Sequence, residues 1–334
     1  MSRSKILVLG AGSWGTALAI QLSQNKSNHV YLWSWKKDHC QQMKQENENS
    51  QFLPGCQFQE NLEICDDWKA VINDIDDILI GVPSSAFEST VKELASHIHK
   101  QGVIWATKGF CHDSYKFLHE IAQEYLPKHT PLAIITGPSF AKEVANHLPT
   151  AVVIAGSDDF FNQKMQTAFT SENFRVYVTH DLIGAQVGGA LKNALAIATG
   201  ISDGLGFGAN ARIGLITRGM VELQKLGQVL GAEPETLMGL SGLGDLVLTC
   251  TDNQSRNRQF GLQIGAGLTM DEALKSIGQV VEGIPTAKSI YNLGKQKGIE
   301  LPIVEQIYRV LFNDLSPKEA VKNLMSRVPK AEQI

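Results

Sequence analysis

One charged side chain interrupts an otherwise apolar helical pattern between Val187 and Ile197. This stretch reads VGGALKNALAI, and Lys192 is its only charged residue. A helix that is apolar on nearly all sides is buried, and burial lowers the pKa of a lysine unless a partner pairs with it. Such a lysine suits proton transfer to or from a bound molecule. The alternative is a lysine at a helix rim that extends to solvent; Asn193 and the nearby glycines favour the wall of a site.

Three glycines near the start of the chain have the spacing of a dinucleotide-binding turn. Gly10, Gly12 and Gly15 match G-x-G-x-x-G between a short apolar run and a helical pattern, which is the context that the motif requires. The first permits a tight turn, the second admits a pyrophosphate, and the third lets the helix pack on the strand. The helix N-terminus can then face the phosphates. This context favours a dinucleotide over a turn without a ligand.

The end of the second predicted strand indicates which dinucleotide is used. NAD-selective sites usually place Asp or Glu there to hold the ribose 2′-OH. Here Trp35 is followed by Lys36 and Lys37, and the first acid is Asp38. Lys36 and Lys37 can accept a 2′-phosphate and Trp35 can stack on adenine, although the two lysines can equally be solvated side chains. The sequence therefore favours NADP(H) without excluding NAD(H).

Four further groups have the residue types of a substrate site. Lys108 follows the predicted strand VIWAT, and Gly137 and Ser139 follow the predicted strand LAIIT. Ligands of doubly wound sheets bind beyond such strand ends, although both places also suit ordinary turns. Asp245 begins an apolar helical run, where capping would be its ordinary role. The cluster Ser255–Asn257 opens a later helix, and an arginine beside helix-end N–H groups suits a phosphate dianion.

The pattern along the chain changes near residue 180. Before it, strands alternate with helices, which predicts a Rossmann-type, doubly wound and mostly parallel sheet; after it, helical patterns dominate. We therefore expect a dinucleotide-binding domain at residues 1–180 and an all-helical substrate-binding and catalytic domain at residues 181–334. The polar stretch Gln41–Ser50 is expected to be a solvated helix end or loop. The predicted strands cover residues 5–10, 29–35, 77–82, 103–107, 132–136 and 150–155.

Composition excludes several classes of protein. The chain has 334 residues, 43% of them apolar and 19% charged, which suits two globular domains and excludes disorder as the main state. A net charge of −4 does not indicate a nucleic-acid partner. Five cysteines without a C-x-x-C pair argue against a disulfide scaffold and a four-cysteine zinc site.

No stretch reaches the roughly 18 to 20 apolar residues of a membrane span, and the N-terminus lacks the apolar stretch of a signal peptide. We expect a cytoplasmic protein without bound metal or membrane insertion.

Together, these segments resemble the bacterial NAD(P)-dependent glycerol-3-phosphate dehydrogenases nearly from end to end. The resemblance implies reversible hydride transfer between NAD(P)H and dihydroxyacetone phosphate, which gives sn-glycerol 3-phosphate for phospholipid synthesis. We also expect a homodimer. The resemblance is carried by GAGSWGTALA at 10–19, WATKG at 105–109, GPSFAKE at 137–143, GGALKN at 188–193, SDGLGFGANAR at 202–212, GLGDLVLTCTDNQSRNR at 242–258 and GQVVEG at 278–283.

The resemblance also implies roles for single residues. Lys192 matches the catalytic acid–base lysine, Asp245 would orient or tune it, and Lys108 matches a lysine that touches cofactor and substrate. Trp14 stands where other members carry Phe or Tyr, and Trp35 where many carry Arg or His. The residues that would hold substrate are Lys108, Gly137, Ser139, Lys192, Asp245, Ser255, Arg256 and Asn257. Those that would hold cofactor are Gly10, Gly12, Ser13, Trp14, Gly15, Trp35, Lys36, Lys108, Ala141, Arg256, Val281 and Glu282.

Two other functions fit parts of the sequence. Other β-hydroxyacid dehydrogenases also combine a dinucleotide domain with following helices, but they have no need for the SRNR cluster at 255–258. A non-catalytic dinucleotide sensor would bind cofactor but would not require a buried Lys192.

Overall fold

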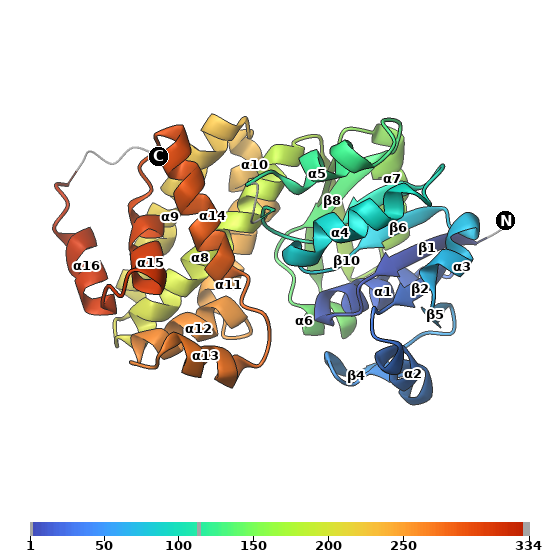
Figure 1. The fold of residues 1–334 in the computed structure, drawn as a ribbon, viewed down its shortest axis with the longest axis horizontal. Coiled ribbons are helices and arrows are strands. Elements are labelled where there is room, and N and C mark those ends of the chain that lie inside the picture. Colours follow the sequence, from blue (N-terminus) through green and yellow to red (C-terminus); the bar gives the residue numbers. More distant parts are fainter. Residues whose placement is uncertain (1–2, 112–114, 330–334) are drawn as a thin grey trace. The chain divides into compact units, whose positions relative to one another are not determined.

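The computed structural model describes residues 3–111 and 115–329, which form two compact units (Figure 1). The first unit contains residues 3–111 and 116–182, and the second contains Tyr115 and residues 183–329. Met1 and Ser2, which begin the N-terminal segment that lacks a signal-peptide pattern, lie outside the described residues.

An eight-stranded sheet organises the described part of the first unit, in the order β10-β9-β8-β7-β6-β1-β2-β5. All neighbouring strands pair in parallel except β8 and β9, which are antiparallel. The sheet is therefore mostly parallel, and the Rossmann-type prediction is confirmed. Its strands are β1 (Ser4–Leu9), β2 (Asn28–Trp33), β5 (Leu62–Cys65), β6 (Asp77–Ile80), β7 (Gly102–Trp105), β8 (Leu132–Thr136), β9 (Thr150–Gly156) and β10 (Phe174–Thr179).

β5 and β10, the two edge strands of this sheet, were not predicted from the sequence. Along β10, three of the six residues are exposed, and β5 has only four residues. An edge strand is covered less completely than a central one, so its sequence lacks the continuous apolar run that identified β1, β6, β7 and β8.

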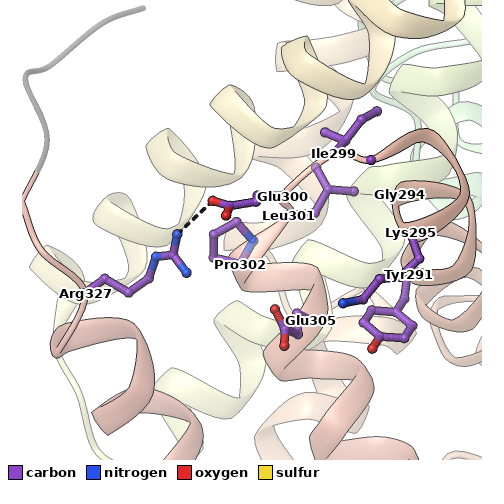
Figure 2. Close-up of a pocket in the computed structure, with 10 residues that line it drawn as sticks. Tyr291, Gly294, Lys295, Ile299, Glu300, Leu301, Pro302, Glu305 and Arg327 are labelled. Carbon is purple, nitrogen blue, oxygen red and sulfur yellow. Dashed lines mark hydrogen bonds and ion pairs between the residues drawn. The ribbon is translucent and has the colours of Figure 1, made fainter.

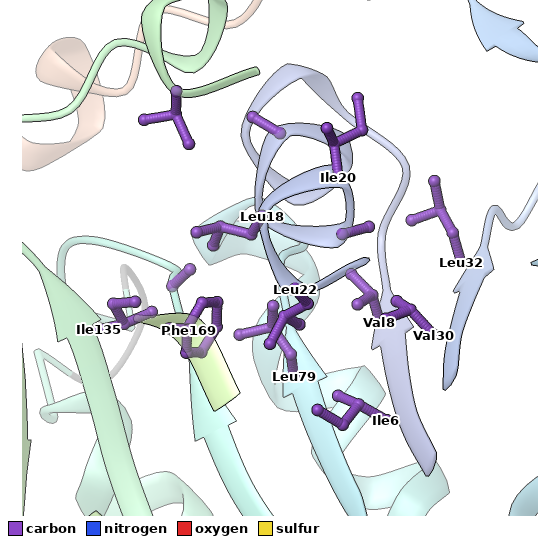
Figure 3. Packing of buried hydrophobic residues seen from close by; sticks show 14 of the residues in the cluster. Ile6, Val8, Leu18, Ile20, Leu22, Val30, Leu32, Leu79, Ile135 and Phe169 are labelled. Carbon is purple, nitrogen blue, oxygen red and sulfur yellow. The ribbon is translucent and has the colours of Figure 1, made fainter. Parts of the chain in front are cut away.

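Helix α1 packs on the sheet immediately after the glycine-rich turn. Leu18, Ile20 and Leu22 of α1 belong to the same buried cluster as Ile6 and Val8 of β1 (Figure 3). A Cβ atom at Gly15 would lie 1.9 Å from the Gly10 carbonyl oxygen, so the close approach of helix and strand requires glycine. The helices of this unit are α1 (Ser13–Gln24), α2 (Lys37–Glu46), α3 (Trp68–Val71), α4 (Ser84–Ala95), α5 (Leu118–Tyr125), α6 (Ala141–Ala145) and α7 (Asp159–Phe169).

A short hairpin follows α2 and corrects one prediction. Strands β3 (Glu48–Asn49) and β4 (Leu53–Gln57) pair antiparallel outside the main sheet. The polar stretch Gln41–Ser50 was expected to be solvated, and this is wrong for Asn49, which is completely buried. Its carboxamide makes four hydrogen bonds to protein groups, and bonding of that kind makes the burial of a polar side chain tolerable.

In the described residues of the second unit, every element of regular secondary structure is a helix. Helix α8 is buried almost along its whole length because glycines on it admit close neighbours. A Cβ atom at Gly188 would lie 2.4 Å from the Ser241 carbonyl oxygen, and one at Gly200 would lie 2.2 Å from that of Arg258. The helices are α8 (Leu182–Gly204), α9 (Ala209–Leu230), α10 (Pro234–Met238), a π-helical turn (Leu240–Gly244), α11 (Asp245–Thr251), α12 (Arg256–Gly265), α13 (Met270–Ile277), α14 (Gly283–Lys297), α15 (Pro302–Phe312) and α16 (Pro317–Met325).

Across residues 3–111 and 115–329, no helix combines the length and apolarity that crossing a membrane would require. All five cysteines are described, and each is a buried free thiol.

Candidate active site

The glycine-rich turn of the first unit has the form of a phosphate cradle. Gly10 has φ +115°, a left-handed conformation that favours glycine. A Cβ atom at Gly12 would meet nothing within 4 Å, so the backbone there faces open space. Helix α1 begins at Ser13 with Gly12 as its N-cap, and no side chain of the described residues caps it. Its first N–H groups can therefore bind an anion, and this geometry fits a dinucleotide pyrophosphate.

The two residues after Gly12 are partly engaged by the protein itself. The Ser13 hydroxyl donates to the Phe52 carbonyl oxygen at 2.8 Å. Trp14 packs against the core of the sheet, and its Nε1 is buried without a hydrogen-bond partner among the residues that the structure describes. The Trp14 Nε1–H group is therefore a buried donor that no described group satisfies.

The end of β2 presents an aromatic ring and two cations to solvent. Trp35 is 75% exposed, and the Lys36 ammonium lies 5.1 Å from the centre of its ring. Lys36 and Lys37 are both exposed at the start of α2. The position therefore carries positive charge and an accessible ring surface, as an adenosine 2′-phosphate would require.

Lys108, Gly137 and Ser139 come together beyond neighbouring strands β7 and β8. The Lys108 ammonium donates to the Gly137 carbonyl oxygen at 3.4 Å, and the Ser139 hydroxyl donates to the same oxygen at 2.9 Å. Gly137 has φ +131°, and a Cβ atom there would lie 3.1 Å from Val152 Cα. Ala141, the first residue of α6, follows and packs against the core. The structure thus gathers residues that the sequence places about 30 positions apart.

The second unit pairs Lys192 with Asp245 in its interior. The Lys192 ammonium donates to the Asp245 carboxylate, and the two side chains are 8% and 1% exposed. It also donates to the Thr249 hydroxyl oxygen at 3.1 Å, while that hydroxyl donates to the Asp245 carbonyl oxygen at 2.6 Å. The rim position considered for Lys192 is therefore excluded. The arrangement holds a buried cation by a charge partner and an oriented hydroxyl group.

An amide network lies beside this pair on α8 and α12. The Asn257 amide donates to the Asn193 side-chain oxygen at 3.0 Å, and the Gly283 N–H donates to the Asn257 side-chain oxygen at 2.8 Å. Because Asn193 adjoins Lys192 in the chain, the network connects the lysine helix to the start of α14. Val281 is buried and Glu282 is half-buried in the segment that leads into this contact.

The start of α12 carries Arg256 and is capped by its own sequence. The Ser255 hydroxyl oxygen accepts from the Arg258 N–H at 3.2 Å. Arg256 is exposed, and its guanidinium donates to Gln279 at 3.1 Å. Ser255 therefore has a local capping role, while the guanidinium keeps further donors for an anion.

Thr249, Gln279 and Gly283 were not singled out by the sequence analysis, although each contacts a predicted site residue. Thr249 lies four positions after Asp245 on α11, so helical spacing alone would have placed both on one face. Gln279 and Gly283 carry no comparable signal because they reach α12 only through tertiary packing.

A separate cavity in the second unit is a poor place for a dianion. It has a volume of about 280 Å³ between the end of α14 and the start of α15 (Figure 2). Its wall combines Lys295 and Arg327 with Glu300 and Glu305, and Arg327 pairs with Glu300 at 3.3 Å. The charges balance, and no residue predicted to bind substrate or cofactor lines it. The described residues also contain no group of three or more His, Cys, Asp or Glu side chains arranged to hold a metal ion.

The matching family models and the relatives similar in sequence name the same family. Family models described as the N-terminus and the C-terminus of NAD-dependent glycerol-3-phosphate dehydrogenase match residues 5–161 and 181–322. A glycerol-3-phosphate dehydrogenase [NAD(P)+] of Francisella tularensis subsp. novicida is 53% identical over 332 residues, which is 99% of both chains.

Two solved structures extend the comparison to the fold. The glycerol-3-phosphate dehydrogenase of Coxiella burnetii is 46% identical, with a TM-score of 0.94 over 97% of this chain and 99% of that one. The glycerol-3-phosphate dehydrogenase GPD1 of Saccharomyces cerevisiae has the same fold at 24% identity, with a TM-score of 0.84 over 97% of this chain and 99% of that one. This chain therefore belongs to the NAD-dependent glycerol-3-phosphate dehydrogenase family.

Proposed function

We propose that this protein reduces dihydroxyacetone phosphate to sn-glycerol 3-phosphate with NAD(P)H, and that it catalyses the reverse reaction. It is an oxidoreductase of a family that uses a nicotinamide dinucleotide. The observation that carries the proposal is the buried Lys192–Asp245 pair, together with the bond from Asn257 to the neighbouring Asn193, in a chain of this family. The pair supplies acid–base chemistry, and the α12 residues supply donors for a phosphate.

Lys192 is the proposed general acid and base. During reduction its ammonium gives a proton to the carbonyl oxygen at substrate C2, and during oxidation the neutral amine takes that proton back. The bound nicotinamide supplies or accepts the hydride. The Asp245 carboxylate stabilises the ammonium form, and Thr249 presents its hydroxyl oxygen to the same nitrogen, so the lysine is held before substrate arrives.

Arg256 and Asn257 are proposed to hold the substrate phosphate, with Ser255 shaping the start of α12. The Arg256 guanidinium has more donors than its single bond to Gln279 uses. Lys108, Gly137 and Ser139 are proposed as further substrate-binding residues because they match family positions. Lys108 would favour the negative charge that develops on the carbonyl oxygen.

For the cofactor, we propose the cradle of Gly10–Gly15 for the pyrophosphate and the end of β2 for the adenosine. The exposed Trp35 and Lys36 support the proposal that the enzyme uses NADPH at least as efficiently as it uses NADH. Ala141, Val281 and Glu282 are proposed as further cofactor contacts because they match family positions.

We further propose a cytoplasmic homodimer that supplies glycerol 3-phosphate for phospholipid synthesis. Five reduced, buried thiols support a reducing compartment. Exposed apolar side chains near the start of α9, Phe207 at 41% and Ile213 at 55%, support a protein partner on the second unit.

Oxidation of NADPH in the presence of dihydroxyacetone phosphate, followed by the absorbance of NADPH, tests the function. We expect turnover with dihydroxyacetone phosphate and very little with unphosphorylated dihydroxyacetone or with a 2-keto acid. Efficient turnover of the keto acid would indicate another hydroxyacid dehydrogenase. Cofactor binding without turnover of any of the three substrates would indicate a sensor.

A further inference from the structure

The β3–β4 hairpin contacts the cofactor cradle through one buried side chain. Asn49 of β3 donates from its side-chain nitrogen to the Ala11 carbonyl oxygen at 2.9 Å and to the Thr16 hydroxyl oxygen at 2.8 Å. Ala11 lies inside the G-x-G-x-x-G turn, and Thr16 lies in the first turn of α1. All three residues are at most 5% exposed. One carboxamide therefore holds both sides of the turn that surrounds the open position at Gly12.

The other end of the Asn49 carboxamide is held by His39. Both amide hydrogens of Asn49 are used on the cradle, so its oxygen must be the acceptor for the Phe52 N–H at 3.2 Å and for His39 Nε2 at 3.0 Å. His39 Nε2 therefore carries a hydrogen. His39 Nδ1 lies 3.0 Å from the hydroxyl oxygen of Ser34, the residue that follows β2. These contacts prevent the carboxamide from rotating by half a turn.

The hairpin contacts the cradle at a second point. The Ser13 hydroxyl at the start of α1 donates to the Phe52 carbonyl oxygen at 2.8 Å. Two independent hydrogen-bonded contacts thus join a two-stranded hairpin to the turn. A turn that contains Gly10 and Gly12 has wide backbone freedom of its own, so such contacts reduce the number of conformations that the turn can adopt.

We propose that Asn49, oriented by His39, is a positioning residue that holds the glycine-rich turn in the conformation that binds the dinucleotide pyrophosphate. This inference rests on the proposed use of NAD(P)H. A turn that is already ordered loses less conformational freedom when the ligand binds, so affinity rises without any contact between Asn49 and the ligand. His39 contributes by selecting the orientation of the Asn49 carboxamide.

The test compares NADPH affinity in two asparagine variants, measured without substrate by the change in NADPH fluorescence. The control is Asn28, which is 2% exposed and donates to the carbonyl oxygens of Leu22 and Ala168 at 2.8 and 3.0 Å, at the other end of β2. Asn49→Ala should raise the Kd for NADPH about tenfold, which corresponds to about 1.4 kcal/mol. Asn28→Ala should lower Tm about as much as Asn49→Ala does but keep the Kd for NADPH within about twofold.

A milder variant keeps the test decisive if Asn49→Ala does not fold. Thr16→Val preserves shape but removes one acceptor of the Asn49 amide, so the Kd should rise about threefold, roughly 0.7 kcal/mol. In steady state, both variants of the cradle should raise KM for NADPH, with kcat and KM for dihydroxyacetone phosphate little changed.

Two results would overturn the inference: a Kd within twofold of the parent in every folded cradle variant, or an equal loss of affinity in Asn28→Ala. Failure of the proposed reaction is separately visible, because the binding comparison needs no turnover. A parent protein that binds NADPH but does not reduce dihydroxyacetone phosphate would refute the reaction and still decide the role of Asn49.

Discussion

At the scale of single residues, the Lys192–Asp245 contact gives the strongest chemical constraint on function. The Lys192 side chain is 8% exposed, and its buried ammonium group would destabilise the fold without a partner; the Asp245 carboxylate and the Thr249 hydroxyl are its partners. The same contacts leave a lysine whose position and hydrogen bonds are set before substrate binds. Such preorganisation is what an acid–base group needs.

Replacing Lys192 by Met should nearly abolish turnover while NADPH binding persists. The methionine keeps the apolar stem but has no proton to transfer, and loss of general acid–base help costs about 10² to 10⁴ in rate. The measurement is kcat with dihydroxyacetone phosphate, together with the Kd for NADPH. Lys225→Met, which removes an exposed lysine on α9, is the control. A Lys192→Met rate within a few-fold of the parent would refute the assignment.

Replacing Trp35 by Asp should shift preference toward NADH. A carboxylate at the end of β2 repels a 2′-phosphate and accepts a hydrogen bond from a 2′-OH. We expect the ratio of kcat/KM for NADPH to that for NADH to fall at least tenfold, a change of about 1.4 kcal/mol. The control is Trp33→Phe, two residues earlier at the end of β2, which should leave the ratio unchanged. Strong selectivity of the parent for NADH would contradict the premise.

The sequence predicted the surroundings of single residues better than it predicted contacts between distant residues. The apolar surroundings of Lys192 and the spacing of Gly10, Gly12 and Gly15 are local patterns, and both residue environments are found in the structure. The pairing of Lys192 with Asp245 spans 53 positions. Helix and strand periodicities relate only residues that are close in the sequence, so the pair itself could not be derived from the residues alone.

At the scale of elements, the start of α12 combines a guanidinium with a helix N-terminus, and Arg256→Ala should therefore impair use of a phosphorylated substrate. A charged hydrogen bond is worth about 1.5 to 3 kcal/mol, so kcat/KM for dihydroxyacetone phosphate should fall at least tenfold. Unphosphorylated dihydroxyacetone should be affected much less. Arg218→Ala, an exposed arginine on α9, is the control. Equal losses for both substrates would place the phosphate site elsewhere.

Helix α15 is capped by a glutamate from another helix. Glu222 of α9 is 4% exposed, and its carboxylate accepts from the N–H groups of Ile303 at 2.6 Å and Val304 at 3.2 Å. Burial raises the pKa of Glu222 to about 7, although the two N–H donors oppose that shift. As pH rises, the unfolded chain loses the Glu222 proton near pH 4.5, whereas the folded protein keeps it until about pH 7.

This difference predicts that Glu222 makes stability fall as pH rises. Between about pH 4.5 and pH 7 the folded state binds the proton and the unfolded state does not, so the free energy of unfolding declines by up to about 3 kcal/mol and levels off above pH 7. Urea unfolding of the parent and Glu222→Gln at pH 5, 6, 7 and 8 measures the change. The free energy of unfolding of the parent should fall relative to that of Glu222→Gln across this range, and parallel pH profiles would contradict the prediction. Exposed Glu235→Gln serves as the control.

At the scale of the whole molecule, we expect sedimentation to give a mass of about 73 kDa, twice the 36.5 kDa of one chain. Phe207 and Ile213, exposed near the start of α9, are the apolar side chains that we propose for the contact between subunits. Ile213→Lys should shift the mass toward the monomer, whereas Val328→Lys, a change at another exposed apolar residue, should not. A parent mass of one chain would remove the homodimer from the proposal.

The amino-acid sequence by itself determined the fold class and the types of chemistry. Buried parallel strands and apolar helices leave continuous patterns because each must cover its faces, and the glycine turn leaves a fixed spacing. Only the tertiary structure decided which distant groups meet: Lys192 with Asp245, Asn257 with Gly283, and Asn49 with the cradle. A polar residue such as Asn49 has the same local pattern whether it is solvated or buried. Its environment is set by partners elsewhere in the chain, and those partners are known only once the chain has folded.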